Sequence, residues 1–420
     1  MAKRHSNEHY IVAIDIGSSK IVVLFAEEGA GGRLEIFGQA QGRSAGVRRG
    51  QIVDIEATSM AVRAVAEKAY LSCNTNIGGA TINISDPNLR VFNLTTNTHM
   101  DNSGRVKEAD VKRVIKTAES VKIAKAERHI SSVTQHYILD KDPHTGQGVV
   151  VRQPIGEEAE MLEVNMHIVV ASEQGVKNIE SSIELNDIKV LHVVPSSMAS
   201  SEPYLTQDQK DDGVCLVDIG SGVMDLSVFK NGSIVHSEVI QRGAESVTSD
   251  IADAFNTTFE EAERLKLKYG QAQITLPGED KLIEFQQVND INDYYLSHQS
   301  LIKVIELAYL DLFKLIRNRL NNGKYYRSLK EGFVLVGGGV KIENCDKLMS
   351  GLFKKKVRIG HVNTGLIRVN TNSVSSNDDL LAPEYACALG LLLFENDEHG
   401  LKERQSVNKA GFIKKLKLKF

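Results

Sequence analysis

Two short segments about 200 positions apart each carry an aspartate followed by small residues, and each lies between two apolar runs. The first begins at Asp15 and the second at Asp218. Small residues let backbone amides approach phosphate oxygens closely, and a leading carboxylate can organise a divalent cation through its waters. Each segment therefore predicts a phosphate-holding turn between two antiparallel strands. Together with a glycine triplet after an apolar strand at 332–336, they indicate a nucleotide held between two related halves.

The phosphate-binding residues are expected to come from both turns. The first turn supplies Asp15, Gly17, Ser18, Ser19 and Lys20, and the second supplies Asp218, Gly220, Ser221, Gly222 and Val223. The two leading aspartates are expected to hold the waters of a Mg²⁺ ion, because a triphosphate needs its charge offset before two loops can enclose it. Two unrelated surface hairpins are the alternative. Asp225 could face the same cation or cap its own turn, and the sequence leaves both open.

A glycine triplet and a charged pair add to the predicted site. The triplet consists of Gly337, Gly338 and Gly339. A side chain there would block close approach of the backbone to a ligand, although a plain glycine-rich turn is the alternative. Glu263 and Lys266 are spaced i and i+3 on an expected helix, so their side chains share one face. A solvated ion pair is the alternative for these two residues.

The remaining composition is that of an ordinary globular protein. At 420 residues, with 42% apolar and 25% charged side chains, the chain can hold two or more domains with separate cores. The net charge of −4 conceals an asymmetry, because the last twelve residues carry five lysines and no acid. An acidic body with one basic tail argues against a nucleic-acid surface and for one local electrostatic contact.

Cysteines, histidines and apolar runs restrict the classes further. The four cysteines lie far apart and are expected to be buried thiols in a reducing compartment, and the twelve histidines lack metal-ligand spacing. Residues 1–9 are polar and precede only a strand-length apolar run, which is not the pattern of a signal peptide. No window approaches 18 consecutive apolar residues, so no membrane span is expected.

The two halves of the chain show the same order of expected elements. In the first half, the strands around the Asp15 turn are followed by a third strand, a helix beginning near Asp54 and a strand over 80–84. In the second half, the strands around the Asp218 turn are followed by a strand over 233–240 and a helix over 246–255. This order predicts a duplicated fold.

Two insertions interrupt the repeat. Residues 85–163 are expected to form an α+β unit with strands at 90–94, 132–139 and 161–164 and a helix over 107–125. The main domain is then expected to resume with strand 168–171, helix 176–185 and strand 189–194. Residues 256–329 are expected to be mostly helical, ending in a helix over 300–320. A helix rich in small residues, beginning at Pro383, could cross closely against a partner helix.

The C-terminal segment has the pattern of an amphipathic helix. At ~100° per residue, an apolar face groups within about one third of the circumference. It consists of Phe412, Ile413, Leu416 and Phe420. The lysines that fill most of the remainder are Lys414, Lys415, Lys417 and Lys419, and Leu418 lies off the face. The pattern favours an anchor in the interface of an anionic membrane over a solvated tail. One copy would bind reversibly, and many copies in a polymer would bind tightly.

Three motifs in combination resemble those of the actin, sugar kinase and heat-shock chaperone superfamily. They are Asp15-Ile-Gly-Ser-Ser-Lys20, Asp218-Ile-Gly-Ser-Gly-Val-Met-Asp225 and Leu335-Val-Gly-Gly-Gly339, which match its phosphate-1, phosphate-2 and adenosine motifs. The position of the 85–163 insertion, and the basic amphipathic end after a polar linker, are similar to those of FtsA, the family of bacterial cell-division actins. The similarity runs from about Tyr10 to Phe420.

The resemblance implies an α/β, actin-like duplicated ATPase fold with two lobes and a nucleotide cleft. The implied parts are a first lobe (1–84, 164–205 and 375–394), an FtsA-type insertion (85–163), a second lobe (206–245 and 330–374) with a helical insert (246–329), a flexible linker (395–407) and a membrane-targeting amphipathic helix (408–420).

The resemblance also implies ligands and partners. It implies ATP with Mg²⁺, with Glu263 and Lys266 near the ribose and adenine and with Gly243 as a further nucleotide-binding residue. It implies a protein that polymerises on the cytoplasmic face of the inner membrane at the division site. Its implied partners are FtsZ and other division proteins, further copies of itself and the anionic membrane, and no nucleic acid.

The sequence identifies no residue for ATP hydrolysis. At most slow ATPase activity is expected, and a nucleotide-gated assembly switch is equally open. Two other functions are compatible with the motifs. One is an actin-like pilus-assembly scaffold, and the other is an ATPase or kinase of the superfamily with an incidental tail.

Overall fold

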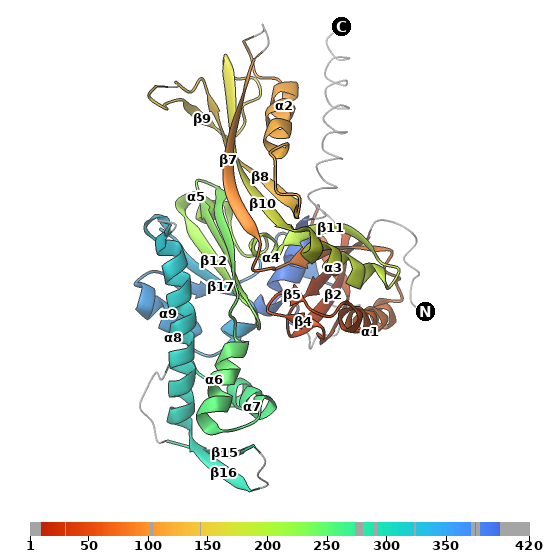
Figure 1. The fold of residues 1–420 in the computed structure, drawn as a ribbon, viewed down its shortest axis with the longest axis vertical. Coiled ribbons are helices and arrows are strands. Elements are labelled where there is room, and N and C mark those ends of the chain that lie inside the picture. The colour runs from red at the N-terminus through yellow and green to blue at the C-terminus, as the bar shows by residue number, and fades with distance from the viewer. Residues whose placement is uncertain are drawn as a thin grey trace.

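The computed structural model describes residues 10–29, 31–100, 104–142, 144–273, 280–288, 292–322, 325–370, 374 and 379–394. Two sheets occupy the middle of the molecule, and further elements project from this centre at both ends (Figure 1). The predicted linker 395–407 and the predicted amphipathic helix 408–420 lie outside the described residues.

The first sheet has six strands in the order β11-β6-β1-β2-β3-β19. They are β1 (Tyr10–Ile16), β2 (Lys20–Glu28), β3 (Leu34–Arg43), β6 (Gly79–Ile84), β11 (Lys189–Pro195) and β19 (Ile367–Val369). Helices α1 (Ile55–Cys73) and α3 (Glu173–Glu184) pack on this sheet. Apolar side chains of the helices and of the strands form one buried cluster between them. Asp54 caps α1 by accepting a hydrogen bond from the Ala57 amide, which explains why the helix begins there.

The second sheet repeats five strands of the first, in the order β14-β13-β12-β17-β18. They are β12 (Val214–Ile219), β13 (Met224–Lys230), β14 (Ser233–Ile240), β17 (Gly332–Val336) and β18 (Val357–Ile359). In each sheet the first three strands of the half pair antiparallel, and the last two join parallel to the leading strand. The predicted duplication is therefore confirmed.

One apolar core joins the two sheets. It contains side chains from β1, β2, β12 and β17 together with the helical residues 386–394. A Cβ on Gly390 would lie 1.8 Å from the Ala199 carbonyl oxygen of α4 (Ser196–Ala199), so this glycine lets the two helices cross in contact. The predicted close crossing is confirmed. Cys215, Cys345 and Cys387 are buried free thiols, as expected, whereas the free thiol Cys73 is only half-buried, against the expectation.

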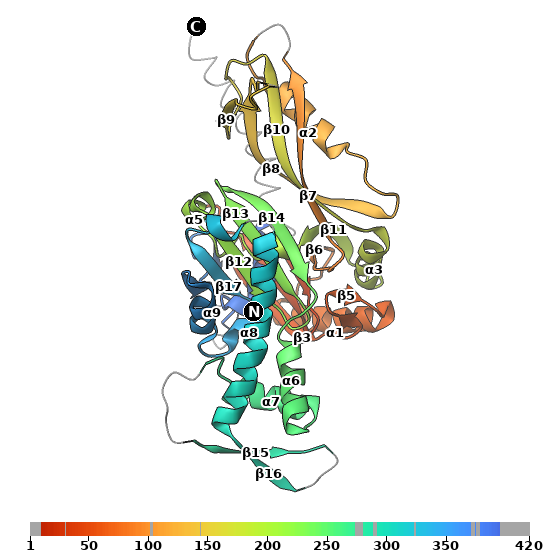
Figure 2. The same cartoon turned by 60° about the vertical axis from the view of Figure 1, so that its left-hand side comes forward.

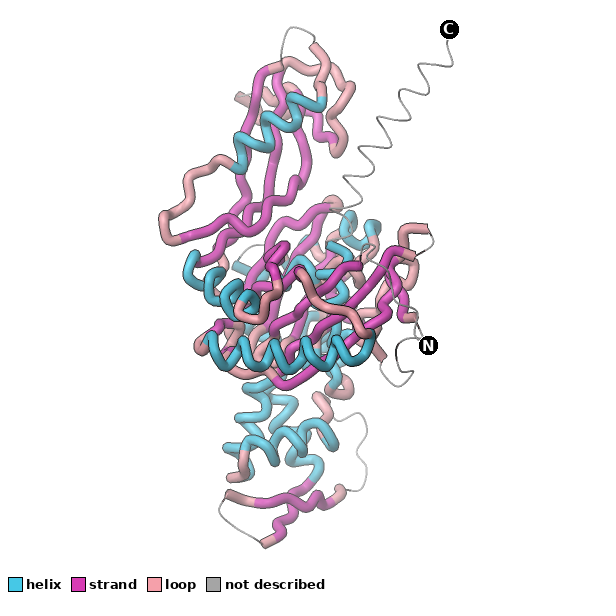
Figure 3. The backbone as a smooth tube through the Cα atoms, turned by 90° about the vertical axis from the view of Figure 1, so that its right-hand side faces the viewer, coloured by secondary structure: helices cyan, strands magenta, loops and turns pink. Residues whose placement is uncertain are grey.

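The insertion after β6 is a separate four-stranded sheet in the order β7-β10-β8-β9. Its elements are β7 (Arg90–His99), α2 (Glu108–Glu119), β8 (Glu127–Leu139), β9 (Val149–Val151) and β10 (Met161–Ser172). Helix α2 lies against one face of this sheet (Figure 3). The expectation of two strands over 161–171 is wrong, because β10 is continuous and pairs with β7 and β8 along its length. Helix α2 also ends earlier than expected, since Val121 and Ile123 leave the helix to pack against the insertion core.

Residues between β14 and β17 form the opposite end of the molecule. They include α6 (Glu245–Phe255), α7 (Phe259–Tyr269) and the long α8 (His298–Asn322), which runs from the second sheet to a small hairpin (Figure 2). That hairpin, β15 (Leu282–Gln286) and β16 (Asp293–Ser297), was not expected in a mostly helical insert. Its first strand alternates buried and exposed residues, which is the two-residue period of a half-buried strand.

Short elements complete the chain. They are β4 (Val47–Arg48), β5 (Gln51–Ile52), α5 (Gln207–Asp212), α9 (Cys345–Phe353) and the 3₁₀ turns η1 (Tyr326–Ser328), η2 (Gly338–Lys341) and η3 (Pro383–Tyr385). Among the described helices, none combines the length and apolar character that crossing a bilayer would require.

Candidate functional site

A cavity of about 580 Å³ lies where the two sheets meet. The predicted site residues that line it are Asp15, Gly17, Ser18, Ser19, Lys20, Asp218, Gly220, Ser221, Gly222, Val223, Glu263, Lys266, Gly337, Gly338 and Gly339. The structure thus brings together residues from four distant segments of the chain. The role of each residue in ligand binding stays a prediction.

The two predicted turns have the same internal geometry. The Gly17 amide donates to the Lys20 carbonyl oxygen over 3.0 Å, and the Gly220 amide donates to the Val223 carbonyl oxygen over 3.0 Å. The turns also approach each other across the cavity, because a Cβ on Gly222 would lie 2.5 Å from Ser18 Oγ. A small group enclosed there would meet backbone amides from both sheets.

The start of α6 packs against the second turn and hydrogen-bonds to its backbone. The amides of Ala244 and Glu245 donate to the carbonyl oxygens of Gly220 and Ser221, each over 2.9 Å. A Cβ on Gly243 would lie 2.4 Å from the Ser221 carbonyl oxygen. Gly243 therefore packs beneath the turn and is not among the residues that line the cavity, in contrast to the other predicted residues.

Three carboxylates face the cavity, of which Asp218 and Asp225 are buried and Asp15 is half-buried. The Ser200 hydroxyl donates to Asp218 over 2.5 Å, and the Ser85 hydroxyl donates to Asp225 Oδ2 over 2.6 Å. The pKa of Asp218 is raised to about 6, chiefly by burial and also by the neighbouring Asp15 carboxylate, while the hydrogen bond from Ser200 opposes the shift. Burial likewise raises the pKa of Asp15, and it raises that of Asp225 well above its usual range with a further contribution from Asp218.

This group of carboxylates fits a divalent cation held through water. Asp225 Oδ1 is buried and has no hydrogen-bond partner among the described residues. Its other oxygen bonds Ser85 of the first half of the chain, which favours the interpretation that Asp225 faces the cation over the turn-capping alternative. No group of three or more His, Cys, Asp or Glu in the described ranges could ligate one ion directly. Water and phosphate oxygens would therefore complete the coordination.

Lys20 is held at the end of the cavity by residues that the sequence analysis missed. Its Nζ lies 3.9 Å from Glu384 Oε1 and 4.3 Å from the ring centre of Tyr385. Glu384 also accepts from Lys341 Nζ over 2.7 Å. Burial lowers the pKa of Lys20, while Glu384 and Asp15 oppose that shift. Two lysines thus share one carboxylate beside the space between the two turns.

Glu263 and Lys266 of α7 share one face, as predicted. Glu263 Oε2 lies 2.6 Å from Lys266 Nζ and 2.5 Å from Thr248 Oγ1. Lys266 Nζ also donates to the Ala244 carbonyl oxygen over 3.2 Å, and the lysine side chain is only 7% exposed. The pair is therefore not the solvated ion pair of the alternative interpretation. It links α7 to the start of α6, which holds the second turn.

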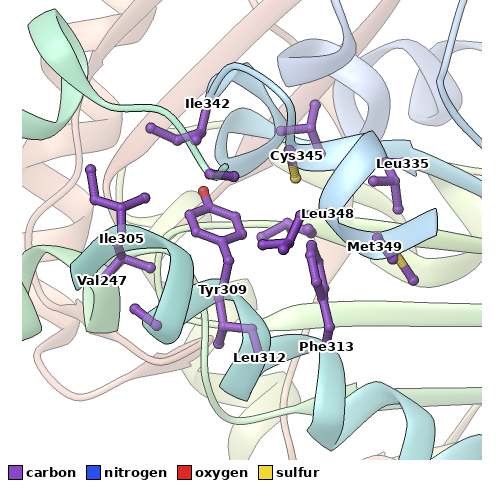
Figure 4. Close-up of a cluster of buried hydrophobic side chains, with 14 of the residues drawn as sticks. Val247, Ile305, Tyr309, Leu312, Phe313, Leu335, Ile342, Cys345, Leu348 and Met349 are labelled. Atoms are coloured by element: carbon purple, nitrogen blue, oxygen red, sulfur yellow. The ribbon is translucent and has the colours of Figure 1, made fainter. Parts of the chain in front are cut away.

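The three glycines of the triplet have different environments. Gly337 has φ of 90°, and its Cβ would lie 2.3 Å from Asp218 Oδ1, whereas a Cβ on Gly339 would lie 2.5 Å from Ile219 Cγ2. A Cβ on Gly338 meets nothing within 4 Å. Tyr309 of α8 donates to the Gly339 carbonyl oxygen over 2.6 Å, and its ring is set among the apolar side chains of Figure 4. Close packing against β12 thus requires glycine at positions 337 and 339, whereas Gly338 faces open space.

Several polar residues of the site lie outside any motif. Asn83 accepts from the Ile16 amide over 2.7 Å and donates to Ser196 Oγ over 3.1 Å, which fixes the end of β1 beside the first turn. Ser85 and Cys387 also line the cavity. An asparagine within a short, buried and mostly apolar strand was a signal that could have indicated Asn83. No comparable pattern marks the serine or the cysteine.

Solved structures of low sequence identity share this architecture. The PilM–PilN type IV pilus biogenesis complex has a TM-score of 0.62 at 15% identity, with 91% of this chain and 97% of that chain covered. MreB5 of Spiroplasma citri bound to AMPPNP has a TM-score of 0.55 at 14% identity, with 95% and 100% covered. The duplicated sheets, the matched turns and these likenesses define a protein with the actin-like fold.

Sequence comparisons narrow this class to one family. The family model "Cell division protein FtsA" matches residues 215–390, and the model "SHS2 domain inserted in FTSA" matches residues 87–170. The cell division protein FtsA of Pseudomonas aeruginosa is 32% identical over 384 residues, covering 91% of this chain and 88% of that protein. The FtsA of Escherichia coli K12 is 28% identical over 418 residues, covering 97% and 96%. The chain belongs to the FtsA family of actin-like cell-division proteins, and the pilus scaffold shares only its fold.

Proposed function

We propose that this chain binds ATP with Mg²⁺ in the cavity between its two sheets and that the bound nucleotide controls its assembly into filaments. One observation carries the proposal. Two turns with the same internal hydrogen bond face one cavity from opposite sheets. They lie so close together that a side chain on Gly222 would clash with Ser18 of the other turn. MreB5, a structural neighbour, is described with ADP and with AMPPNP.

The phosphates would lie between the two turns. Backbone amides over 17–20 and 221–223 would donate to phosphate oxygens. The Lys20 ammonium group would leave Glu384 and form a charge-assisted hydrogen bond with a phosphate oxygen. Asp15 and Asp218 would hold the waters of the Mg²⁺ ion, with Asp225 as a third negative charge nearby. The ion supplies the positive charge that lets a triphosphate and three carboxylates share one buried site.

The nucleoside would occupy the end of the cavity between α7 and the glycine triplet. Glu263 and Lys266 line this end together with the open face of Gly338. A carboxylate and an ammonium group can bond ribose hydroxyls and adenine nitrogens. Lys266 Nζ lies near the acceptors Ala244 O, Thr248 Oγ1 and Glu263 Oε2, so it would exchange one of them for a nucleoside atom.

We further propose a peripheral protein on the cytoplasmic face of the inner membrane that tethers FtsZ filaments at the division site. Membership of the cell-division family and the basic, amphipathic sequence of 408–420 support this role. Slow ATPase activity is compatible with the site, in which no residue is assigned to activate water. The kinase alternative has no support beyond the fold, because no base for an acceptor hydroxyl is identified.

Membrane attachment is tested by vesicle co-sedimentation of matched variants. Phe412→Glu places a charge on the predicted apolar face and should lower vesicle binding at least ~10-fold, because burial of one large apolar side chain contributes ~1.5 to 3 kcal/mol. Leu418→Glu makes the same change in charge off that face and should lower binding less. ATP binding should persist in both variants.

The same samples test assembly. Electron microscopy on anionic lipid monolayers should show ATP-dependent filaments for the full chain and none for residues 1–407. Equal sedimentation of Phe412→Glu and the parent chain would refute the anchor while leaving the nucleotide site untouched.

A further inference from the structure

A second cavity, of about 520 Å³, lies where the insertion, the first sheet and residues 386–394 meet. Its apolar lining comes from three separate parts of the chain. It includes Ile130 and Val133 of β8, Leu191 of β11, Met198 of α4 and Phe394. We call this cavity the β11 groove. None of these residues lines the proposed nucleotide site.

The β11 groove borders an open sheet edge. Strand β11 is the last strand of the first sheet, and no described strand pairs with its outer edge. The register with β6 breaks between Val190 and His192, and Leu191 at this break is 40% exposed. Open edges with apolar side chains are usually covered in native proteins, since they otherwise invite non-specific pairing.

The groove is also the place where the described chain ends. Phe394, the last described residue, forms part of its wall and contacts His192 edge to face, with ring centres 5.8 Å apart. Residues 395–420 follow directly. The flexible linker predicted over 395–407 would keep 408–420 within roughly 20 Å of the groove on average. Such a short tether gives a local concentration on the order of 1 mM.

The charges of the groove match those of this segment. Its charged lining consists of Glu119, Glu180 and Arg128. Arg128 forms ion pairs with Glu173 over 2.8 Å and with Glu180 over 2.6 Å, so the lining carries an excess of negative charge. The last twelve residues carry five lysines and no acid. Their predicted apolar face has the side-chain chemistry that an apolar groove accepts.

We propose that residues 408–420 dock into the β11 groove when no membrane is present, so that the groove and the membrane compete for one segment. At a local concentration of about 1 mM, an intrinsic dissociation constant of about 0.1 mM would keep the segment docked about 90% of the time. The apparent affinity for vesicles would then fall about tenfold. Only this competition rests on the proposed membrane anchor, because docking itself does not require it.

Docking is tested by photo-crosslinking in the full chain. A benzoylphenylalanine at position 191 should crosslink to residues 408–420, and vesicles of phosphatidylethanolamine and phosphatidylglycerol should abolish the crosslink. The same probe at Leu307, an exposed leucine of α8, is the control and should give none. A mixture of isotopically light and heavy chains shows whether a crosslink joins one chain or two. Crosslinks between chains, or to no part of 408–420, would overturn the proposal.

Competition is tested by vesicle titration of groove variants. Leu191→Asp and Glu119→Lys should each bind anionic vesicles three- to tenfold more tightly than the parent, because they release the segment. Leu307→Asp should bind like the parent. Both groove residues are exposed, so each variant should fold, and thermal melting is the check on this. Equal or weaker binding of both groove variants contradicts the competition, and a full chain without any vesicle binding contradicts the anchor but not the crosslink.

Discussion

The carboxylates of Asp15, Asp218 and Asp225 share one cavity, where burial disfavours their ionised forms, and for Asp218 and Asp225 the charge of a neighbouring carboxylate adds to this effect. Lys20 is a nearby cation, but Glu384 already lies close to it. Protons therefore bind these carboxylates more readily than usual, which is what the raised pKa values describe. A bound cation would replace those protons and stabilise the folded chain.

Stability should consequently depend on pH in a defined direction. The pKa of Asp218 is about 6 in the folded chain, compared with 3.8 for an unperturbed aspartate, so its contribution is fully present below about pH 4 and is lost as pH rises through 6. Asp218→Asn removes this dependence. Between pH 5 and 7 the unliganded parent chain should lose roughly 1 to 2 kcal/mol more stability than this variant.

Urea denaturation of the unliganded protein at both pH values measures this difference. Asp311→Asn, which changes an exposed carboxylate of α8, is the control and should follow the parent chain. Parallel pH profiles for the parent and Asp218→Asn would show that Asp218 ionises with an ordinary pKa.

At the scale of elements, the site depends on how closely the backbone of one segment approaches another. The Gly337 segment packs against the end of β12, and the Gly222 turn packs against Ser18. Such approaches tolerate no side chain, whereas Gly338 faces open space in the cavity. Neighbouring glycines of one turn thus have separable functions, one in folding and one in the proposed ligand contact.

This separation predicts different results for two single-methyl changes. Gly337→Ala should destabilise the chain by about 2 kcal/mol or more, because φ is 90° and the methyl group meets Asp218. Gly338→Ala should change stability by less than about 0.5 kcal/mol. It should instead weaken ATP binding, since its methyl group enters the space assigned to the nucleoside. Thermal melting and calorimetry distinguish the two, and equal melting temperatures for both variants would contradict the assignment.

Sequence reasoning predicted the elements whose pattern is local. Both turns, the order of strands around them and the start of α1 at its Asp54 cap follow from apolar alternation, small residues and a capping side chain. The β15–β16 hairpin was missed because its strands are short. The continuous β10 was read as two strands because polar Asn165 and His167 interrupt its apolar run, although β7 and β8 pair with it throughout.

Sequence reasoning also predicted many of the residues that line the cavity, because the phosphate motifs are compact. The residues that were missed come from other parts of the chain. Ser85 follows β6, and Glu384 and Cys387 precede or begin the helical residues 386–394. Only the tertiary packing brings them to the cavity. Gly243 was included as a ligand residue but supports the second turn from below, a distinction that requires the distance from its Cβ position to Ser221.

At the scale of the whole molecule, the insertion contacts both halves. The insertion follows β6 in the chain and is followed by α3, both of which belong to the first half. Its polar side chains form hydrogen bonds with β14 of the second sheet. Asn93 donates to the Val235 carbonyl oxygen over 3.0 Å, and Gln135 donates to that of Ile234 over 2.7 Å. Buried His167 lies 3.1 Å from Ser237 Oγ. Strand β14 continues towards the start of α6, which holds the second turn, so the insertion and the cavity share one structural element.

The central claim is that two turns from opposite sheets together bind one Mg²⁺-bound triphosphate. Titration calorimetry with ATP and Mg²⁺ tests it most directly on Lys20→Ala of the first turn, Asp218→Ala of the second and Lys303→Ala of an exposed ion pair on α8 as the control. We expect each turn variant to lose at least ~10-fold in affinity, because a charge-assisted contact contributes about 1.5 to 3 kcal/mol, and the control to bind like the parent. If both turn variants, folded by circular dichroism, hold ATP as tightly as the parent chain, the claim is contradicted.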